Sequence, residues 1–147
     1  MAVEEKITAH LSENGESAYA VNISVSGYNF KGDEPVSFGG GGLAPAPYDY
    51  LLAALGECTA MTVRWYAIQQ KWSLDKVEVN ISHRKASASE LPEAEGKTGK
   101  VDLFEKQVII YSNSLTDEQK KKLVDVAAKC PVQRTLLSDV VIRTNSF

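Results

Sequence analysis

Hydrophobic residues recur at every second position in residues 4–11, 19–25 and 77–81, and this period is typical of half-buried β-strands. Three further stretches are also expected to be strands, namely 28–31, 101–111 and 140–144. Asn14 and Gly15 indicate a hairpin turn between the first two strands. The pattern therefore predicts several short strands spread over most of the chain.

A long helix is predicted from residue 48 to about residue 70, where Gly56 is the sole helix breaker. Pro47 suits the first position of a helix, because the N–H that proline lacks has no partner there in any case. At about 100° per residue, one face would carry Leu51, Ala54, Leu55, Cys58, Met61, Thr62 and Trp65. We therefore expect a central helix with an apolar stripe that includes Cys58.

A second helix is indicated by a capping box, in which Thr116 caps the backbone and Gln119 reaches back. Its apolar side would hold Leu123, Val124 and Ala127. It would end near Lys129, and a short helix would follow at residues 131–137. Strands on both sides of a long helix, without regular alternation of strands and helices, predict a single α+β domain over residues 1–147.

Two segments are expected to be loops. Four consecutive glycines within residues 37–50 indicate a flexible loop. A phosphate-binding loop is not favoured, because the lysine and hydroxyl residue that end such a motif are missing. Residues 86–100 are polar and are expected to form a mobile loop.

Composition and charge narrow the classes of function. Apolar residues make up 44% of the chain and charged residues 24%, as in ordinary globular proteins. The net charge of −3 provides no basic surface for nucleic acid or an anionic membrane. The N-terminus lacks the apolar core of a signal peptide, and no apolar run approaches the ~20 residues of a membrane span. We therefore expect a cytoplasmic protein, with no nucleic-acid or membrane partner.

The segment AKCPVQRT, residues 128–135, places Cys130 directly before Pro131. Proline disfavours helical geometry in the residue before it and suits the start of a new helix, so Cys130 should be the N-cap. A helix N-terminus favours a thiolate, and Arg134 on the same face would add positive potential. The alternative is a small buried cysteine that only packs, and the residues themselves leave both open.

Cys58 by itself is more typical of a core residue, because it lies on the apolar stripe of a helix. In the cytoplasm, however, a pair of cysteines is more often reactive or metal-binding than a structural disulfide. Only the tertiary structure could bring Cys58 and Cys130 together. A zinc site is not favoured, because His10 and His83 lack the usual close ligand spacing. We expect no metal and no cofactor.

The segment PAPYDYLLAALGECTAMTVRWYA, followed far downstream by AAKCPVQRTL, resembles the OsmC/Ohr family of organic hydroperoxide peroxidases. The motifs come in family order: GDEP, the glycine loop, a helix start of the type P-x-[DE]-L-L, the helix cysteine and C-P-V-x-R-T. The sequence is most similar to the branch whose members carry P-Y-E-x-L and C-P-V-H-R-T-L. These motifs read PYDYL and CPVQRTL here.

The resemblance implies an OsmC-like fold, in which antiparallel sheets wrap a long central helix in an intertwined homodimer. It also implies reduction of organic hydroperoxides, with Cys58 as the peroxidatic thiol and Cys130 as the resolving thiol. In such chemistry a thiolate becomes a sulfenic acid, and a second thiol condenses with it to a disulfide. The implied reductant is a small dithiol or a lipoylated protein.

The sequence departs from the family pattern at the cation that activates the first thiol. Well-studied members use an arginine from the N-terminal strands, whereas this chain has no arginine before Arg64. Arg64 would lie about 120° from the face of Cys58. Lys31 could substitute, although it lacks the planar fork of a guanidinium group. Arg134 is the better placed candidate.

The residue after the helix-start proline also departs from the pattern. The family has a glutamate there, whereas this chain has Tyr48, with the acid one residue later at Asp49. On a regular helix Asp49 would face away from Cys58, about 14 Å along the axis. A favourable charge in the first helical turn is the simpler role for Asp49.

Two function classes stay open at this point. The first is a thiol peroxidase that serves in defence against oxidative stress. The second is a non-catalytic homodimer that binds a small hydrophobic ligand and has inherited the thiol pair. A pKa well below ~8.5 at Cys58 would favour the peroxidase.

Overall fold

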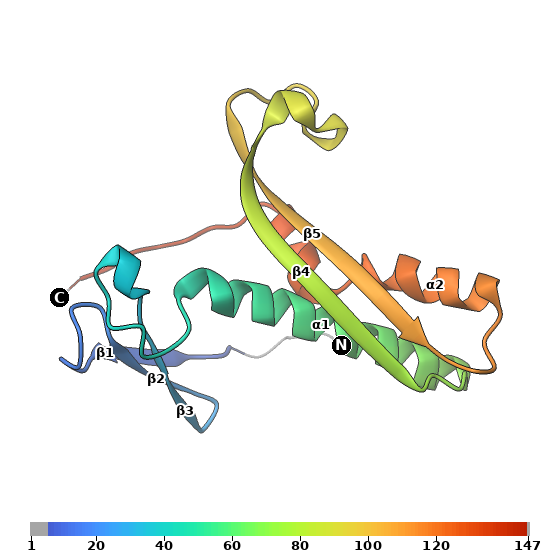
Figure 1. Ribbon diagram of the computed structural model, residues 1–147, viewed down its shortest axis with the longest axis horizontal. Coiled ribbons are helices and arrows are strands. Elements are labelled where there is room, and N and C mark those ends of the chain that lie inside the picture. The colour runs from blue at the N-terminus through green and yellow to red at the C-terminus, as the bar shows by residue number, and fades with distance from the viewer. Residues whose placement is uncertain (1–5, 147) are drawn as a thin grey trace. The chain divides into compact units, whose positions relative to one another are not determined.

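The computed structural model describes residues 6–146, and the chain divides into two compact units, Met1–Ala53 and Ala54–Phe147. The strands are β1 (Ala9–Glu13), β2 (Val21–Val25), β3 (Tyr28–Gly32), β4 (Lys76–Ser87) and β5 (Lys100–Tyr111). The α-helices are α1 (Pro47–Gln70), α2 (Asp117–Ala127) and α3 (Pro131–Leu137). This α+β element order, with a long helix between two antiparallel sheets in the sequence, confirms the predicted fold class (Figure 1).

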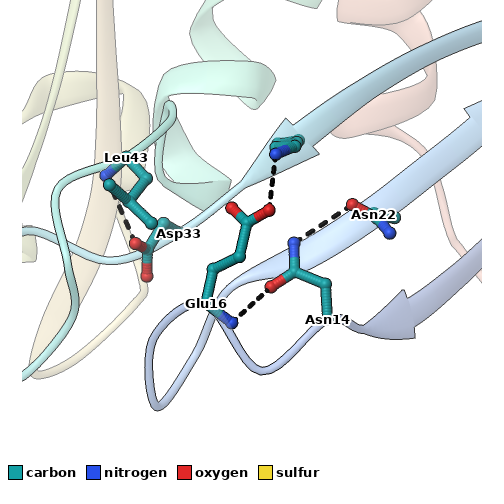
Figure 2. Close-up of polar contacts among 6 residues, drawn as sticks. Asn14, Glu16, Asn22, Asp33 and Leu43 are labelled. Atoms are coloured by element: carbon teal, nitrogen blue, oxygen red, sulfur yellow. Dashed lines mark hydrogen bonds and ion pairs between the residues drawn. The ribbon is translucent and has the colours of Figure 1, made fainter.

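The first unit contains an antiparallel meander in the order β1-β2-β3. The β1–β2 connection is longer than the predicted tight turn, and β2 begins at Val21 rather than at residue 19. Asn14 organises this connection, because its side chain accepts a hydrogen bond from the Glu16 N–H at 2.9 Å and donates one to Asn22 at 3.0 Å (Figure 2). The first predicted strand is shifted to Ala9–Glu13, and its residues 4 and 5 lie outside the described residues.

One buried carboxylate, that of Asp33, holds the glycine-rich segment in place. It accepts a hydrogen bond from the Leu43 N–H at 3.2 Å (Figure 2). It also accepts hydrogen bonds from the Ser17 hydroxyl at 2.8 Å and from the Gly41 N–H at 3.0 Å. A Cβ atom at Gly40 would lie 2.0 Å from the Glu34 carbonyl oxygen, so glycine is required there. The segment is therefore a loop, as predicted, whose backbone is hydrogen-bonded to Asp33.

In the second unit β4 and β5 form one long twisted hairpin (Figure 1). Its connection contains two short 3-10 turns, Ala88–Glu90 and Pro92–Ala94. Ala88 and Ala94 in these turns are both buried. The predicted polar loop is therefore shorter than residues 86–100 and has regular turns.

The main core of the second unit lies where α1, α2 and the hairpin pack together. Its buried members are Val63, Ala67, Leu74, Leu123 and Ala127. The capping box at the start of α2 is confirmed, with hydrogen bonds of 3.1 and 2.9 Å between Thr116 and Gln119. Val126 rather than Val124 is buried on this helix, which corrects one predicted core position.

The buried side of α1 differs from the predicted stripe. Met61 and Trp65 are 48% and 45% exposed, whereas Thr59, Val63 and Ala67 are buried. The helix turns its small and β-branched residues toward the hairpin and α2, because close packing favours compact side chains there. Cys58 stays buried at the edge of this side, so its predicted burial is confirmed.

The predicted strand at residues 140–144 is absent. Residues 139–146 form no regular element, and Val141 and Ile142 are 80% and 85% exposed. Alternating hydrophobic residues form a strand only when a neighbouring strand satisfies their backbone, and neither sheet of the described residues includes this segment. Among the helices of residues 6–146, none is long and apolar enough to cross a membrane.

Asp33 gives a testable dependence of stability on pH. Burial by itself would raise the pKa of Asp33, but hydrogen bonds from Ser17 and three backbone N–H groups hold it below its usual 3.8. The ionised carboxylate therefore stabilises the fold above that value, and the stabilisation is lost as the pH falls through the lower folded-state pKa. We expect Asp33→Asn to lower the free energy of unfolding at about pH 7, with a much smaller loss near pH 3.

Denaturant unfolding at both pH values measures this difference. Glu34→Gln is the matched control, because it removes the neighbouring negative charge, which is not part of this hydrogen-bond network. An equal loss for Asp33→Asn at both pH values would contradict the assigned role of the ionised carboxylate.

Candidate active site

Both cysteines lie in one buried cluster of the second unit. Cys58 comes from α1, and Cys130 comes from the turn between α2 and α3. They pack with Leu55, and partly buried hydrophobic residues surround them: Ile81, Phe104 and Val132. Cys58 is 7% exposed, Cys130 is 0% exposed, and both are free thiols. The fold thus brings together two cysteines that are far apart in the sequence.

Cys130 is the N-cap of α3, as the sequence predicts. It has extended backbone angles, and its sulfur accepts a hydrogen bond from the Gln133 N–H at 3.4 Å. Its carbonyl oxygen accepts the first helical hydrogen bond, from the Arg134 N–H at 3.1 Å. The Arg134 side chain lies in the last turn of α3 and is exposed. The backbone of this turn, rather than the guanidinium group, supports the Cys130 sulfur.

A lysine that sequence reasoning missed lies beside the thiols. Lys106 on β5 donates hydrogen bonds to the Thr59 hydroxyl at 2.9 Å and to the Ala127 carbonyl at 2.8 Å. Thr59 in turn donates to the Cys130 sulfur at 3.6 Å. Burial lowers the pKa of Lys106, and the charges of Cys130 and Cys58 oppose that shift. Lys106 is therefore a partly buried cation coupled to both sulfur atoms.

The two thiols differ in acidity. Burial raises the pKa of Cys58, and a hydrogen bond with Cys130 adds to the increase. Burial would also raise the pKa of Cys130, but hydrogen bonds from Gln133, Thr59 and Cys58, together with the charge of Lys106, hold it below its usual value. The acidic thiol is Cys130, whereas a low pKa at Cys58 was the sign expected of a peroxidase.

The other two candidate cations make contacts of their own. The Arg64 guanidinium donates to the Leu74 carbonyl at 2.6 Å and so joins α1 to the segment that precedes β4. In the first unit, the Lys31 ammonium forms an ion pair with Glu16 at 2.7 Å. The structure thus gives Arg64 and Lys31 structural partners, while Lys106 is the lysine bound at the thiol cluster.

Asp49 has the structural role that the sequence favours. Its carboxylate accepts the N–H of Ala46 at 2.9 Å, in the first turn of α1. Tyr48 lies in the same turn and is 53% exposed. A first-turn acid stabilises a helix through its exposed N–H groups and the helix dipole. No catalytic contact is needed to explain the acid at this position.

A cavity of ≈ 460 Å³ adjoins the thiol cluster. Leu55, Phe104, Lys106 and Gln133 belong both to its wall and to the surroundings of the thiols. Most of the remaining wall is apolar, for example Leu91, Val101 and Leu136. The buried Gln133 side-chain oxygen has no hydrogen-bond partner among the described residues. The cavity therefore combines a mostly apolar wall with Lys106.

The donor groups of the site suit thiol chemistry rather than metal binding. Within residues 6–146, the His, Cys, Asp and Glu side chains form no group of three or more that could hold a metal ion. His83 instead binds the Asp102 carboxylate at 2.9 Å on the hairpin and packs against Phe104.

Comparison with solved structures shows the same fold. An organic hydroperoxide resistance protein OsmC from Legionella pneumophila matches with a TM-score of 0.65 and 20% identity, over 92% of this chain and 91% of that chain. An OsmC-like protein from Mycoplasma pneumoniae matches with a TM-score of 0.67 and 18% identity, over 92% and 89%. An organic hydroperoxide resistance protein from Elizabethkingia anophelis matches with a TM-score of 0.65 and 16% identity, over 92% and 90%. At identities this low, the matches establish a common fold alone.

The fold and the buried thiol pair define an α+β protein of the OsmC type. Residues 39–145 match the family model of the OsmC-like proteins, and this chain belongs to that family. No curated protein matches the sequence.

The capping role of Cys130 can be tested with two substitutions. Serine keeps a side-chain acceptor for the Gln133 N–H, whereas alanine removes it. We expect Cys130→Ala to lower the free energy of unfolding by about 1 kcal/mol more than Cys130→Ser does. Denaturant unfolding under reducing conditions measures the difference. Equal stabilities of the two variants would show that the sulfur contributes packing but no cap.

Proposed function

We propose that this protein is a thiol-dependent peroxidase that reduces organic hydroperoxides through Cys58 and Cys130, as part of oxidative-stress defence in the cytoplasm. The observation that carries the proposal is the packing of two free thiols in one buried cluster, with Lys106 linked to Cys130 through Thr59. Membership of the OsmC-like family supports the same activity, because solved members of this fold include organic hydroperoxide resistance proteins.

The proposed reaction has two steps. The Cys58 thiolate attacks the outer oxygen of the hydroperoxide, so that the O–O bond breaks, Cys58 becomes a sulfenic acid and the alkoxide takes up a proton to become an alcohol. The Cys130 thiolate then attacks the Cys58 sulfur, forming the disulfide and releasing the hydroxide, which is protonated to water. A small dithiol or a lipoylated protein reduces the disulfide by thiol–disulfide exchange.

The roles of the two cysteines are assigned from their solvent exposure and from their relative acidity. Cys58 keeps some exposure while Cys130 has none, so Cys58 is the better placed to meet a peroxide. Cys130 is the more acidic thiol, and we propose that Cys58 becomes the attacking thiolate when its proton passes to Cys130. The alkoxide can then recover the proton from Cys130. The raised pKa of Cys58 is therefore compatible with its peroxidatic role.

The cavity beside the cluster favours an organic hydroperoxide over hydrogen peroxide. Its apolar wall would bury the hydrocarbon part of a substrate, and this burial contributes roughly 25 cal/mol per Å². Hydrogen peroxide has no apolar surface and gains nothing from such a wall. The same wall would serve the alternative function, a protein that binds a small hydrophobic ligand without reacting with it.

Stoichiometric oxidation of the reduced protein tests the proposed function. With cumene hydroperoxide we expect loss of both free thiols and a mass decrease of about 2 Da, faster than with hydrogen peroxide. Cys58→Ser should abolish the fast reaction. Cys130→Ser should stop at a sulfenic acid, a gain of about 16 Da.

The alternative function gives a different pattern in the same experiment. A non-catalytic binder would keep its thiols through many equivalents of both oxidants, and Cys58→Ser would leave the slow oxidation unchanged. A hydrophobic molecule that copurifies with the protein, or protects it against unfolding, would then identify the cavity as a binding site.

We also propose that the protein is an intertwined homodimer of the branch with P-Y-E-x-L and C-P-V-H-R-T-L motifs. The exposed side of α1 supports a dimer, because Met61, Trp65 and Ile68 are 48%, 45% and 61% exposed and form one apolar face of this helix with Ala60 and Val77 nearby. A large exposed apolar patch often marks a protein interface.

A charge on this face tests the dimer. We expect the wild type to sediment as a dimer and Ile68→Glu to shift it toward monomer, because a carboxylate buried at an apolar interface loses its hydration. Gln70→Glu adds the same charge to the other side of the helix end and is the matched control. A monomeric wild type, or an Ile68→Glu variant that stays fully dimeric, would contradict this interface.

A further inference from the structure

We propose that Lys106, acting through the Thr59 hydroxyl, is the positioning residue that keeps Cys130 as the thiolate of the pair. The inference rests on the proposed function in one respect, since it explains how the disulfide-forming step would proceed. The ionisation that it assigns to Cys130 can be measured without any hydroperoxide.

The first argument is a continuous chain of hydrogen bonds. The Lys106 ammonium donates to the Thr59 oxygen at 2.9 Å, and the Thr59 hydroxyl donates to the Cys130 sulfur at 3.6 Å. Thr59 is 0% exposed, and so is Cys130. Water therefore does not compete for these groups, and a charge interaction through them is stronger than at the surface.

The second argument concerns the single proton of the Thr59 hydroxyl. Two acceptors surround it, the Leu55 carbonyl at 2.7 Å and the Cys130 sulfur at 3.6 Å. A neutral carbonyl is the better acceptor when Cys130 is a thiol, whereas a charged sulfur attracts the proton when Cys130 is a thiolate. Lys106 binds the Thr59 oxygen from the other side and polarises the hydroxyl toward donation. The cation thereby favours the charged form of the sulfur.

The third argument is the location of the charges around Cys130. Cys58 from α1 and Lys106 from β5 face it, while Lys129 before it and Arg134 in α3 carry exposed side chains. Lys106 is the cation whose charge lowers the pKa of Cys130. A partly buried ammonium also needs a negative partner, because burial disfavours its charge. A thiolate on Cys130 satisfies this need.

A thiolate at Cys130 matters for the step that forms the disulfide. Attack on the sulfenic acid of Cys58 requires the thiolate of Cys130, because the thiolate is the nucleophile in sulfur exchange. The S–S bond forms as the S–O bond breaks, and the hydroxide that leaves takes a proton from solvent to become water. Lys106 touches neither the peroxide nor the departing oxygen in this step. It acts by holding Cys130 ready as a thiolate.

Thiolate absorbance as a function of pH tests the inference directly. We expect Lys106→Met and Thr59→Val to move the lower thiolate titration upward by about one unit or more. Lys106→Arg keeps the positive charge, so its thiolate titration should stay close to that of the wild type. Lys100→Met removes an exposed lysine from the same strand, outside the cavity wall, and should leave the titration unchanged.

A single turnover then separates the two chemical steps. With one equivalent of cumene hydroperoxide, at a pH below the lower thiolate titration, we expect the sulfenic acid to persist about tenfold longer in Lys106→Met than in the wild type, since one pKa unit there changes the thiolate fraction about tenfold. Its formation should slow less than its conversion to the disulfide. Lys100→Met should match the wild type in both steps.

The outcomes distinguish this inference from the proposed function. Unchanged titrations in Lys106→Met and Thr59→Val would overturn the role of Lys106, whether or not the protein reduces peroxides. A wild type that ignores hydroperoxides, combined with shifted titrations, would refute the peroxidase and leave the role of Lys106 standing. If Lys106→Met does not fold, Thr59→Val and Lys106→Arg decide the question by the same titration.

Discussion

The thiol site depends on one partly buried ammonium group that joins three elements. Lys106 projects from β5, its hydrogen bond to Thr59 holds α1, and its hydrogen bond to the Ala127 carbonyl holds the end of α2. The last carbonyls of a helix lack partners within the helix, and a cation at that end also interacts favourably with the helix dipole. The same contact therefore provides the Ala127 carbonyl at the end of α2 with a hydrogen-bond donor, and it positions the turn that carries Cys130.

This arrangement makes the two cysteines one titrating unit. Each sulfur shifts the pKa of the other, and Lys106 acts on both. Strongly interacting sites lose and gain protons as a pair, so the acidity of either thiol has meaning only together with the other. A raised pKa at Cys58 taken alone is therefore not decisive, because Cys58 titrates together with the more acidic Cys130.

Local signals in the sequence predict the features that depend on neighbouring residues. Pro47 and the Thr116–Gln119 pair mark helix starts, and Pro131 makes Cys130 an N-cap, because these rules act within one turn of the chain. Tertiary packing decides the rest. The alternation in β5 places Lys106 on the same side as Phe104 and Val108, where a charge interrupts an apolar row, but only the folded hairpin shows what it meets.

Lys106 supplies a cation at the thiols, although the sequence lacks an arginine in its N-terminal strands. The family pattern suggests a guanidinium group from the first strands, whereas Lys31 on β3 is paired with Glu16. Here the cation at the thiols comes from β5 and is an ammonium, a compact point charge without a planar fork. Such a group can stabilise a thiolate, but it cannot grip a peroxide with two parallel hydrogen bonds. Under the proposed function, recognition of a hydroperoxide would then depend more on the apolar cavity wall.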